Sequence, residues 1–454
     1  MILETQNNTK LNNVGRYFPH QYHTQKNGKI RFKKHTFFDR PMRKHYTYYL
    51  EEYQKIKLTK FDAGSRDKIK YWLKQDYGFE FSKYTKAGNL KIDEDELEFL
   101  PEASDLMRYL KVVKDISEVR GILDIVKEHS HSVHGRVDTI GAATHRCTHS
   151  KPNVAQTSAD PAFRSCYTVP EGYVLVGADL ANIEVRVLAH YLYQYDGGKY
   201  AETVLSKDMH FYHAGLCGFI EQGLIYDEHN PAHKKARTLS KGFFFSWLYG
   251  SGDTIRGHTL WAEGCLGEYT KEEYDLAKSR IDSRLVEING EYLFPLKKDE
   301  YIQPTELLIF QTIYGKRIAD TFLERMTGIK ELIADCSAQS KSTGYITAID
   351  GRKLYSRSPH SALNLLLQGS AGIIAKKWMI NYNHLAHDRG LIFGEHYWQS
   401  AFIHDEYQCT CLDGYQQTLM ECLEEGASLV TTDFSMNLPI KADATYGKTW
   451  SQTH

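Results

Sequence analysis

The sequence predicts a folded protein of several subdomains that contains both helices and strands, and three observations support this prediction. The chain has 454 residues, about three times the length of a typical domain, so it can bury a substantial core. Its hydrophobic content of 42% and charged content of 25% exclude collagen-like, fully disordered and disulfide-scaffold classes. Short apolar runs typical of strands stand between longer segments of helical periodicity.

Two features of the sequence bear on its cellular compartment. No apolar run approaches the roughly 18 to 20 residues that span a bilayer, and the first residues lack the charged start and apolar centre of a secretory signal. The eight Cys are scattered; Cys409 and Cys411 share one face of a predicted strand, without a second pair to complete a zinc site. We therefore expect no membrane partner, reduced and mostly buried thiols, and a cytoplasmic location.

Positive charge is concentrated near the N-terminus. The whole chain has a formal net charge of -1, whereas residues 1–60 contain thirteen Lys or Arg and only four acids. Residues 27–49 interleave basic and aromatic side chains, which is typical of a surface that neutralises phosphates and stacks bases. A solvated terminal arm is the alternative. We expect deletion of residues 1–60 to weaken DNA or partner binding and to flatten its salt dependence.

Two helices are predicted in the first third of the chain. Ser65 precedes an apolar pattern over 66–75, as expected after an N-cap. Apolar residues recur near helical period over 106–126, which predicts a long helix. Gly121 weakens the second half of this helix, so a helical hairpin is the alternative.

The first chemical signal is Asp179, which lies where a predicted strand gives way to a predicted helix. The apolar run 174–176 predicts a buried strand, and residues 183–192 predict a helix. An acid at this position either caps the helix or coordinates a divalent cation from the end of a rigid strand.

The second signal is the pair Asp405 and Glu406, which interrupts strand-forming residues between Phe402 and Cys411. Neighbouring strand residues face opposite ways, so only one of the two acids would join Asp179 if the strand is regular. A buried acid needs a partner, and a bound metal is a natural one. A surface hairpin is the alternative.

The third signal is the series Arg237, Lys241, Phe245 and Tyr249, spaced four residues apart. Successive members of such a series rise about 6 Å and drift about 40° around a helix, so they form one stripe that is cationic at its start and aromatic at its end. The cations could clamp a triphosphate while the aromatic end meets a sugar and base. A plain buried helix with a Gly-rich stop is the alternative.

Together these segments resemble the family A DNA polymerases, the DNA polymerase I family. DLANIE at 179–184, the series 237–250 and His404-Asp405-Glu406 resemble its three polymerase motifs, in family order. The resemblance extends to residues near 61, to 144–156 and to 349–372, covers roughly residues 60–454, and is closest in the phage replicative branch.

The resemblance implies the α+β class and a right-hand polymerase fold with a thumb, a palm of antiparallel sheet plus helices, and mainly helical fingers. The implied divisions are a basic N-terminal arm (1–60), a thumb-like helical region (61–131), the first part of the palm (132–192), the fingers with insertions (193–359) and the second part of the palm (360–454).

The implied activity is that of a DNA-directed DNA polymerase, a nucleotidyltransferase that uses dNTPs on primer-template DNA, in phage genome replication. Asp179, Asp405 and the Leu180 carbonyl would hold two Mg²⁺ ions, with Mn²⁺ as an alternative ion. Two cations about 3.5 to 4 Å apart activate the primer hydroxyl and neutralise the leaving pyrophosphate. Glu406 would support them, and Lys241 would take part in catalysis.

The resemblance also assigns substrate contacts. For the nucleotide, Arg237, Lys241 and His210 would bind the triphosphate, Tyr249 would stack at the template base, Glu184 would exclude a ribose 2′ hydroxyl, and Phe245 would disfavour dideoxynucleotides. For DNA, the implied contacts are Thr144, Arg146, Gln156, Arg357, Asn364 and Gln368, with His404 beside the primer end.

Departures from the family pattern raise further expectations. His145 stands where relatives have Gly, which alters the local backbone if that Gly has positive φ. Insertions near 221–233 and 262–310 are either partner-docking surfaces or inert. The residues before the thumb-like region are too few for a proofreading exonuclease, so we expect proofreading either to be absent or to reside on a separate exonuclease subunit, with processivity or replisome proteins as further partners. A catalytically silent DNA-binding or scaffold subunit and a metal-dependent nuclease are the competing functions.

Overall fold

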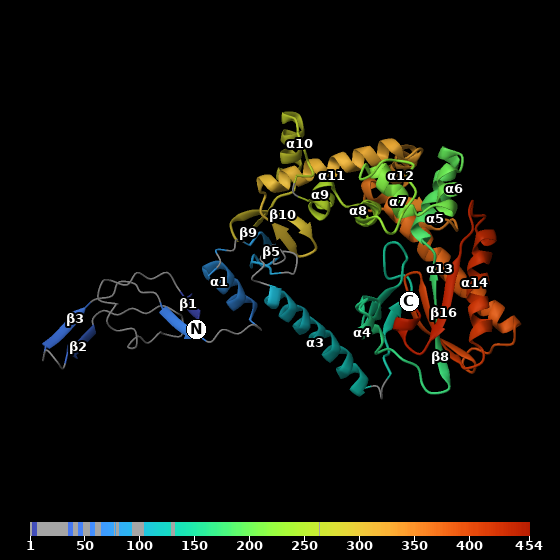
Figure 1. The fold of residues 1–454 in the computed structure, drawn as a ribbon, viewed down its shortest axis with the longest axis horizontal. Coiled ribbons are helices and arrows are strands. Elements are labelled where there is room, and N and C mark those ends of the chain that lie inside the picture. The colour runs from blue at the N-terminus through green and yellow to red at the C-terminus, as the bar shows by residue number, and fades with distance from the viewer. Residues whose placement is uncertain are drawn as a thin grey trace. The chain divides into compact units, whose positions relative to one another are not determined.

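The computed structural model describes residues 2–6, 35–39, 44–48, 55–59, 65–76, 78, 81–92, 104–128, 132–262 and 264–454 (Figure 1). Most of the expected basic arm, including its basic and aromatic side chains, therefore lies outside the described residues. The strands given there are β1 (Ile2–Gln6), β2 (His35–Asp39), β3 (Lys44–Tyr48) and β4 (Lys55–Thr59), paired β1 with β4 and β2 with β3. The chain divides into two compact units, one of residues 1–120 and 285–303 and the other of residues 121–284 and 304–454.

The first unit is built on a four-stranded sheet that joins two distant stretches of sequence. Its order is β5-β11-β10-β9, and all neighbours are antiparallel. Its elements are α1 (Arg66–Asp76), β5 (Lys83–Thr85), the larger part of α3 (Ser104–Glu128), β9 (Val286–Ile288), β10 (Glu291–Lys297) and β11 (Glu300–Ile302). Lys91 pairs with Glu300 across the two stretches. Part of the insertion expected near 262–310 thus completes a sheet with residues 83–85.

Helices α1 and α3 follow the sequence predictions. Ile69 and Leu73 of α1 are fully buried and pack with Leu106 of α3 in a small core. Helix α3 runs without a break through Gly121, so the single long helix is confirmed and the hairpin is not formed.

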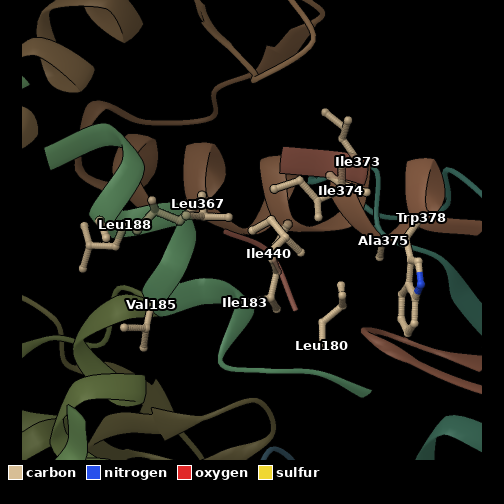
Figure 2. Close-up of a cluster of buried hydrophobic side chains, with 14 of the residues drawn as sticks. Leu180, Ile183, Val185, Leu188, Leu367, Ile373, Ile374, Ala375, Trp378 and Ile440 are labelled. Carbon is tan, nitrogen blue, oxygen red and sulfur yellow. The ribbon is translucent and has the colours of Figure 1, made fainter. Parts of the chain in front are cut away.

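The second unit contains the larger core, which lies against an antiparallel sheet of order β14-β15-β8-β16. These strands are β8 (Tyr173–Leu180), β14 (Tyr397–Ile403), β15 (Glu406–Leu412) and β16 (Ala442–Gly447). Val174, Val176 and Leu180 alternate along β8 and are buried, because one face of the strand packs against helices. Figure 2 shows Leu180 in the same buried cluster as Ile374 and Trp378 of the long helix α13 (Ala362–Asp388). The predicted strand at 174–176 is confirmed and is longer than its apolar run.

Helices make up the rest of the second unit. They are α4 (Pro161–Arg164), α5 (Ile183–Asp196), α6 (Lys199–Ser206), α7 (Met209–Cys217), α8 (Pro231–Leu248), α9 (Asp253–Leu260), α10 (Lys271–Asp282), α11 (Glu306–Arg325), α12 (Ile329–Thr343) and α14 (Gln416–Asp433). Helices α9 and α11 pack so closely that a Cβ on Gly257 would lie 1.6 Å from the carbonyl oxygen of Gln311. Only glycine fits this crossing.

Short elements connect these parts. They are β6 (Arg136–Asp138), β7 (Thr148–Ser150), η3 (Val154–Gln156), β12 (Tyr345–Thr347), β13 (Lys353–Tyr355), η4 (Pro359–Ser361) and η5 (Trp450–Gln452). The eight cysteines are free, and Cys409 and Cys411 are buried on the same face of β15. Among the described residues, no helix has the length and apolar character needed to cross a membrane.

Candidate active site

The site is centred on Asp179, which has an acid directly opposite it on each of the two neighbouring strands. Asp179 on β8 is directly opposite Glu406 on β15 and Asp443 on β16. Residues opposite each other in an antiparallel ladder point to the same face of the sheet. Asp179 therefore has an acidic neighbour on each side. Asp443 was not predicted from the sequence, because it lies in an ordinary strand and only the register of β16 against β8 brings it here.

Asp405 joins this group through a turn. His404 and Asp405 form the connection between β14 and β15, and His404 has a left-handed backbone with φ of 60°. The Leu180 N–H donates to the Asp405 carbonyl oxygen at 3.1 Å, which fixes the turn beside the end of β8. Residues 402–411 therefore do not form one regular strand, which was the condition under which only one acid would join Asp179; instead, the turn connects the antiparallel strands β14 and β15. Because the strand is broken at this turn, both Asp405 and Glu406 act on Asp179.

The acids are electrostatically strained. Partial removal of water, followed by repulsion from Asp405 and Glu406, raises the pKa of Asp179 to about 7. Burial, followed by repulsion from Glu184, raises the pKa of Asp405 to about 6. A cluster of like charges with only partial solvation favours a bound cation, and carboxylate oxygens suit a hard divalent ion. No ready-made cage of three or more His, Cys, Asp or Glu ligands is present in the described part of the chain.

An ion pair lies beside the acids. The Arg146 guanidinium donates to Glu184 in the first turn of α5 at 2.6 Å. Burial lowers the pKa of Arg146, but the attraction of Glu184 outweighs burial and the net pKa is raised. Tyr249 interacts with both charges, and Asn364 of α13 donates to the Tyr249 carbonyl oxygen at 3.2 Å. The structure thus brings together two predicted nucleotide contacts and two predicted DNA contacts.

The segment that carries Arg146 keeps a glycine-like backbone. His145 has φ of 57°, so it adopts the left-handed conformation that a glycine at this position would allow. Lys376 of α13 donates to the His145 carbonyl oxygen. A Cβ on Gly372 would lie 3.1 Å from the Arg146 Cγ, which shows how closely this segment rests on α13.

The cationic and aromatic stripe lies on α8, as predicted, with Tyr249 as the C-cap residue rather than inside the helix. Arg237 donates from Nε to Asp208 at 2.9 Å, and Asp208 in turn caps α7. The ring of His210 on α7 lies 5.8 Å from that of Phe245. Burial, followed by the charges of Arg237 and Lys241, lowers the pKa of His210. Two cations and a neutral imidazole therefore share one side of this helix pair, an arrangement that suits an anionic ligand.

The remaining predicted contacts lie apart from the acids. Gln156 ends η3 and is exposed, as is Arg357, whereas Thr144 and Gln368 are half-buried. The described contacts do not join the side chains of these four residues to the acids. Their direction toward a ligand stays a prediction.

The chain is similar to a known protein family and to proteins of two phages. The model of DNA polymerase family A matches residues 39–260 and 306–452, and thus omits most of the 262–310 insertion. The chain is 28% identical over 437 residues to the DNA-directed DNA polymerases of Enterobacteria phage T3 and Escherichia phage T7. In both cases 88% of this chain and 54% of the relative are covered. The chain therefore spans about half the length of these curated relatives.

The fold also matches a solved structure, the POL domain of Pol1 from M. smegmatis in complex with DNA primer-template and dNTP. The TM-score is 0.62 at 22% sequence identity, and the match covers 87% of this chain and 62% of that chain. This likeness confirms the predicted α+β class and right-hand fold.

Proposed function

Because the chain belongs to DNA polymerase family A, we propose that it is a template-directed DNA polymerase that extends a primer 3′ hydroxyl with dNTPs, in the replication of a phage genome. The named activity of the phage relatives supports this proposal. The single observation that carries it is the placement of Asp179 against Asp405 and Glu406, beside the Arg146–Glu184 pair.

We assign metal binding to Asp179, Asp405 and the Leu180 carbonyl. Burial, together with repulsion from the neighbouring acids, raises the pKa values of the two aspartates, and a bound cation would relieve both effects. When bound, two Mg²⁺ ions, or Mn²⁺ ions in their place, would supply charge neutralisation at the reacting phosphate and a more acidic primer hydroxyl. Glu406 adds negative charge from the neighbouring strand and supports the pair.

We assign the triphosphate to the face shared by α7 and α8. Arg237 and Lys241 would neutralise its oxygens, and neutral His210 would add a hydrogen bond. The Arg237 side chain is pre-oriented because Asp208 holds its Nε. Lys241 is exposed on the same helix and free to take part in charge stabilisation during transfer.

We assign sugar and base selection to Glu184, Phe245 and Tyr249. Arg146 holds Glu184 in place, so this side chain can occupy the space that a ribose 2′ hydroxyl would need. Phe245 has no hydroxyl to replace a missing 3′ group, which disfavours dideoxynucleotides. The ring of Tyr249 lies 6.0 Å from that of Phe245 and continues the aromatic surface toward the template base.

We assign the duplex to polar residues around this centre. Arg and amide side chains suit the minor-groove acceptors common to all base pairs, which lets a polymerase read shape rather than sequence. These residues are Thr144, Arg146, Gln156, Arg357, Asn364 and Gln368, with His404 at the primer end.

We further propose the division into arm, thumb-like region, palm and fingers at 1–60, 61–131, 132–192 with 360–454, and 193–359. The four-stranded sheet of the second unit falls within the two palm ranges, which supports their boundaries. We propose that the chain acts in the cytoplasm, that of the host cell for a phage protein. A separate exonuclease and processivity or replisome proteins are its proposed partners.

A primer-extension gel separates this function from its competitors. Wild type, Asp179→Ala and Asp405→Ala are incubated with labelled primer-template, dNTPs and Mg²⁺. We expect extension by wild type only. Binding without extension by wild type would favour a silent DNA-binding subunit, and degradation without extension would favour a metal-dependent nuclease.

A further inference from the structure

Residues 449–454, here called the 449–454 hook, fold back onto the sheet next to the acids. They follow β16, and their centre is the short helix η5. A Cβ added to Gly177 would lie 2.3 Å from the Thr453 carbonyl oxygen and 2.7 Å from the Thr453 Cβ. Gly177 is two residues before Asp179, on the same face of β8. The hook is therefore seated directly on the strand that carries Asp179, and glycine at 177 is what leaves room for it.

The hook supplies the hydrogen bonds of Glu406. This side chain is only 4% exposed. Its Oε1 accepts from the Trp450 indole Nε1 at 2.6 Å and from Gln408 Nε2 at 2.7 Å, and its Oε2 lies 3.0 Å from His454 Nδ1. Gln408 is itself held by Thr453, whose hydroxyl donates to its Oε1 at 2.7 Å. Each of these contacts comes from the hook or from a side chain that the hook holds.

Trp450 is the most rigid of these donors. Its indole is 4% exposed and packs with Leu175 and Ile403 against the sheet. The Arg164 guanidinium lies 4.7 Å above its ring, and Tyr167 meets the ring edge-on at 5.4 Å. Its backbone N–H donates to the Tyr167 carbonyl oxygen at 3.0 Å. The ring therefore has little freedom to turn, and its N–H direction is fixed.

This arrangement sets the orientation of Glu406 beside Asp179. An indole N–H can only donate, so its partner oxygen must accept, and a charge-assisted bond of this kind is stronger than a neutral one. A buried carboxylate without such donors would pay a large desolvation cost and would move toward other partners. Because Glu406 is directly opposite Asp179, any movement of its carboxylate changes the field at the catalytic acids.

We propose that Trp450 is a positioning residue of the polymerase reaction and acts through Glu406. The inference rests on the proposed function, because its kinetic consequence is measured on nucleotide addition. Loss of a residue that orients a catalytic carboxylate typically costs roughly tenfold to a hundredfold in activity. We expect a loss of this size in kcat when the indole N–H is removed, with a smaller change in KM for dNTP.

A double-mutant cycle tests this coupling. Trp450→Phe removes the N–H and keeps an aromatic ring, and Glu406→Gln removes the charge that the N–H holds. Trp398→Phe is the matched control, since Trp398 lies on β14 of the same sheet with its ring 5.5 Å from Tyr173. Single-nucleotide addition is measured for wild type, both single variants, the double variant and the control.

We expect Trp450→Phe to lower kcat in the wild-type background and to have a smaller further effect in the Glu406→Gln background, where the indole N–H donates to a neutral amide oxygen in place of a carboxylate. The control should retain the wild-type kcat. Equal losses in both backgrounds, or a wild-type kcat for Trp450→Phe, would overturn the proposal. Gly177→Ala provides a second route, because its added Cβ would clash with Thr453 and with Gln408 Nε2, which donates to Glu406, while Trp450 and Glu406 themselves are unchanged. Its loss of kcat should also be smaller in the Glu406→Gln background.

A proton NMR spectrum of the metal-free protein tests the contact between Trp450 and Glu406 without a measurement of activity. The chain has six tryptophans, and the indole N–H signal of Trp450 is identified by its absence in Trp450→Phe. We expect Glu406→Gln to shift this signal upfield, because a neutral acceptor replaces a carboxylate. An unchanged signal would overturn the contact itself. A wild-type enzyme that extends no primer would refute the proposed function, while the indole signal would still decide whether Trp450 holds Glu406.

Discussion

Arg146 and Glu184 form a nearly buried ion pair at 2.6 Å, and this pair joins the segment before β8 to the first turn of α5. The Arg146 side chain is 15% exposed and the Glu184 side chain is 12% exposed, so water screens the pair only weakly. The pair holds in place both Arg146, which we assign to the DNA duplex, and Glu184, which we assign to the sugar of the incoming nucleotide.

Removal of Arg146 should destabilise the fold. Arg146→Ala leaves Glu184 with an uncompensated charge, and breaking a buried pair in this way costs about 3 kcal/mol. We expect a loss of this order in the free energy of unfolding, measured with urea. Arg352→Ala is the control, because its pair with Asp350 is more exposed and should contribute less than about 1 kcal/mol. Equal losses for the two variants would contradict the role given to the Arg146 pair.

Shortening of Glu184 should relax sugar selection. Glu184→Ala opens the space beside the sugar, so the ratio of kcat/KM for a ribonucleotide to that for the matching deoxynucleotide should rise on the order of tenfold to a hundredfold. Glu184→Gln keeps the size of the side chain and should keep most of the selection. A ratio that is unchanged in Glu184→Ala would remove Glu184 from this role.

A hydroxyl at position 245 should admit dideoxynucleotides. Phe245→Tyr supplies a group that can replace the missing 3′ hydroxyl, and one hydrogen bond of about 1.5 kcal/mol corresponds to roughly a tenfold gain in dideoxynucleotide incorporation. The kcat/KM for normal dNTPs serves as the internal control and should change little. If wild type already incorporates both substrates equally well, the assignment of Phe245 is wrong.

Stability of the metal-free protein should fall as pH rises. The pKa of Asp179 is raised from 3.8 to about 7, so the folded state favours the protonated acid, and its stabilising contribution is lost as pH rises from about 4 through about 7. We expect Asp179→Asn to flatten this decline in the Tm measured with EDTA. Mg²⁺ should raise the wild-type Tm more at pH 8 than at pH 5. A larger Mg²⁺ effect at the lower pH would contradict the electrostatic picture of the site.

Much of the site could be predicted because its chemistry is local in sequence. Asp179 follows an apolar strand, and the series from Arg237 to Phe245 lies on one helix, so short-range patterns predict both. Asp443 could not be predicted, because its position opposite Asp179 depends on the register of β16 against β8. The turn at His404 could not be located from the sequence either. Strand-forming residues flank it, and its left-handed backbone lies at a residue other than glycine.

In the fold as well, elements set by local sequence could be predicted, whereas those set by long-range pairing could not. The long helix over 104–128 follows from its periodicity. The sheet of the first unit could not be predicted, since β5 and β11 are separated by about two hundred residues and each strand has only three. Strands this short carry too little periodicity to be recognised alone, and their pairing is set by tertiary contacts such as Lys91 with Glu300.

Single-turnover addition of one templated dNTP measures whether Asp179 and Asp405 form the catalytic centre. Wild type, Asp405→Asn and Asp443→Asn are compared at saturating Mg²⁺ and primer-template. Asp405→Asn keeps the size of the side chain and removes its charge, so we expect the rate to fall about a hundredfold to a thousandfold, as when a principal electrostatic group is lost. Asp443, to which no catalytic role is assigned, should tolerate the same change with a rate within roughly tenfold of wild type. A wild-type rate for Asp405→Asn would exclude Asp405 from the catalytic centre.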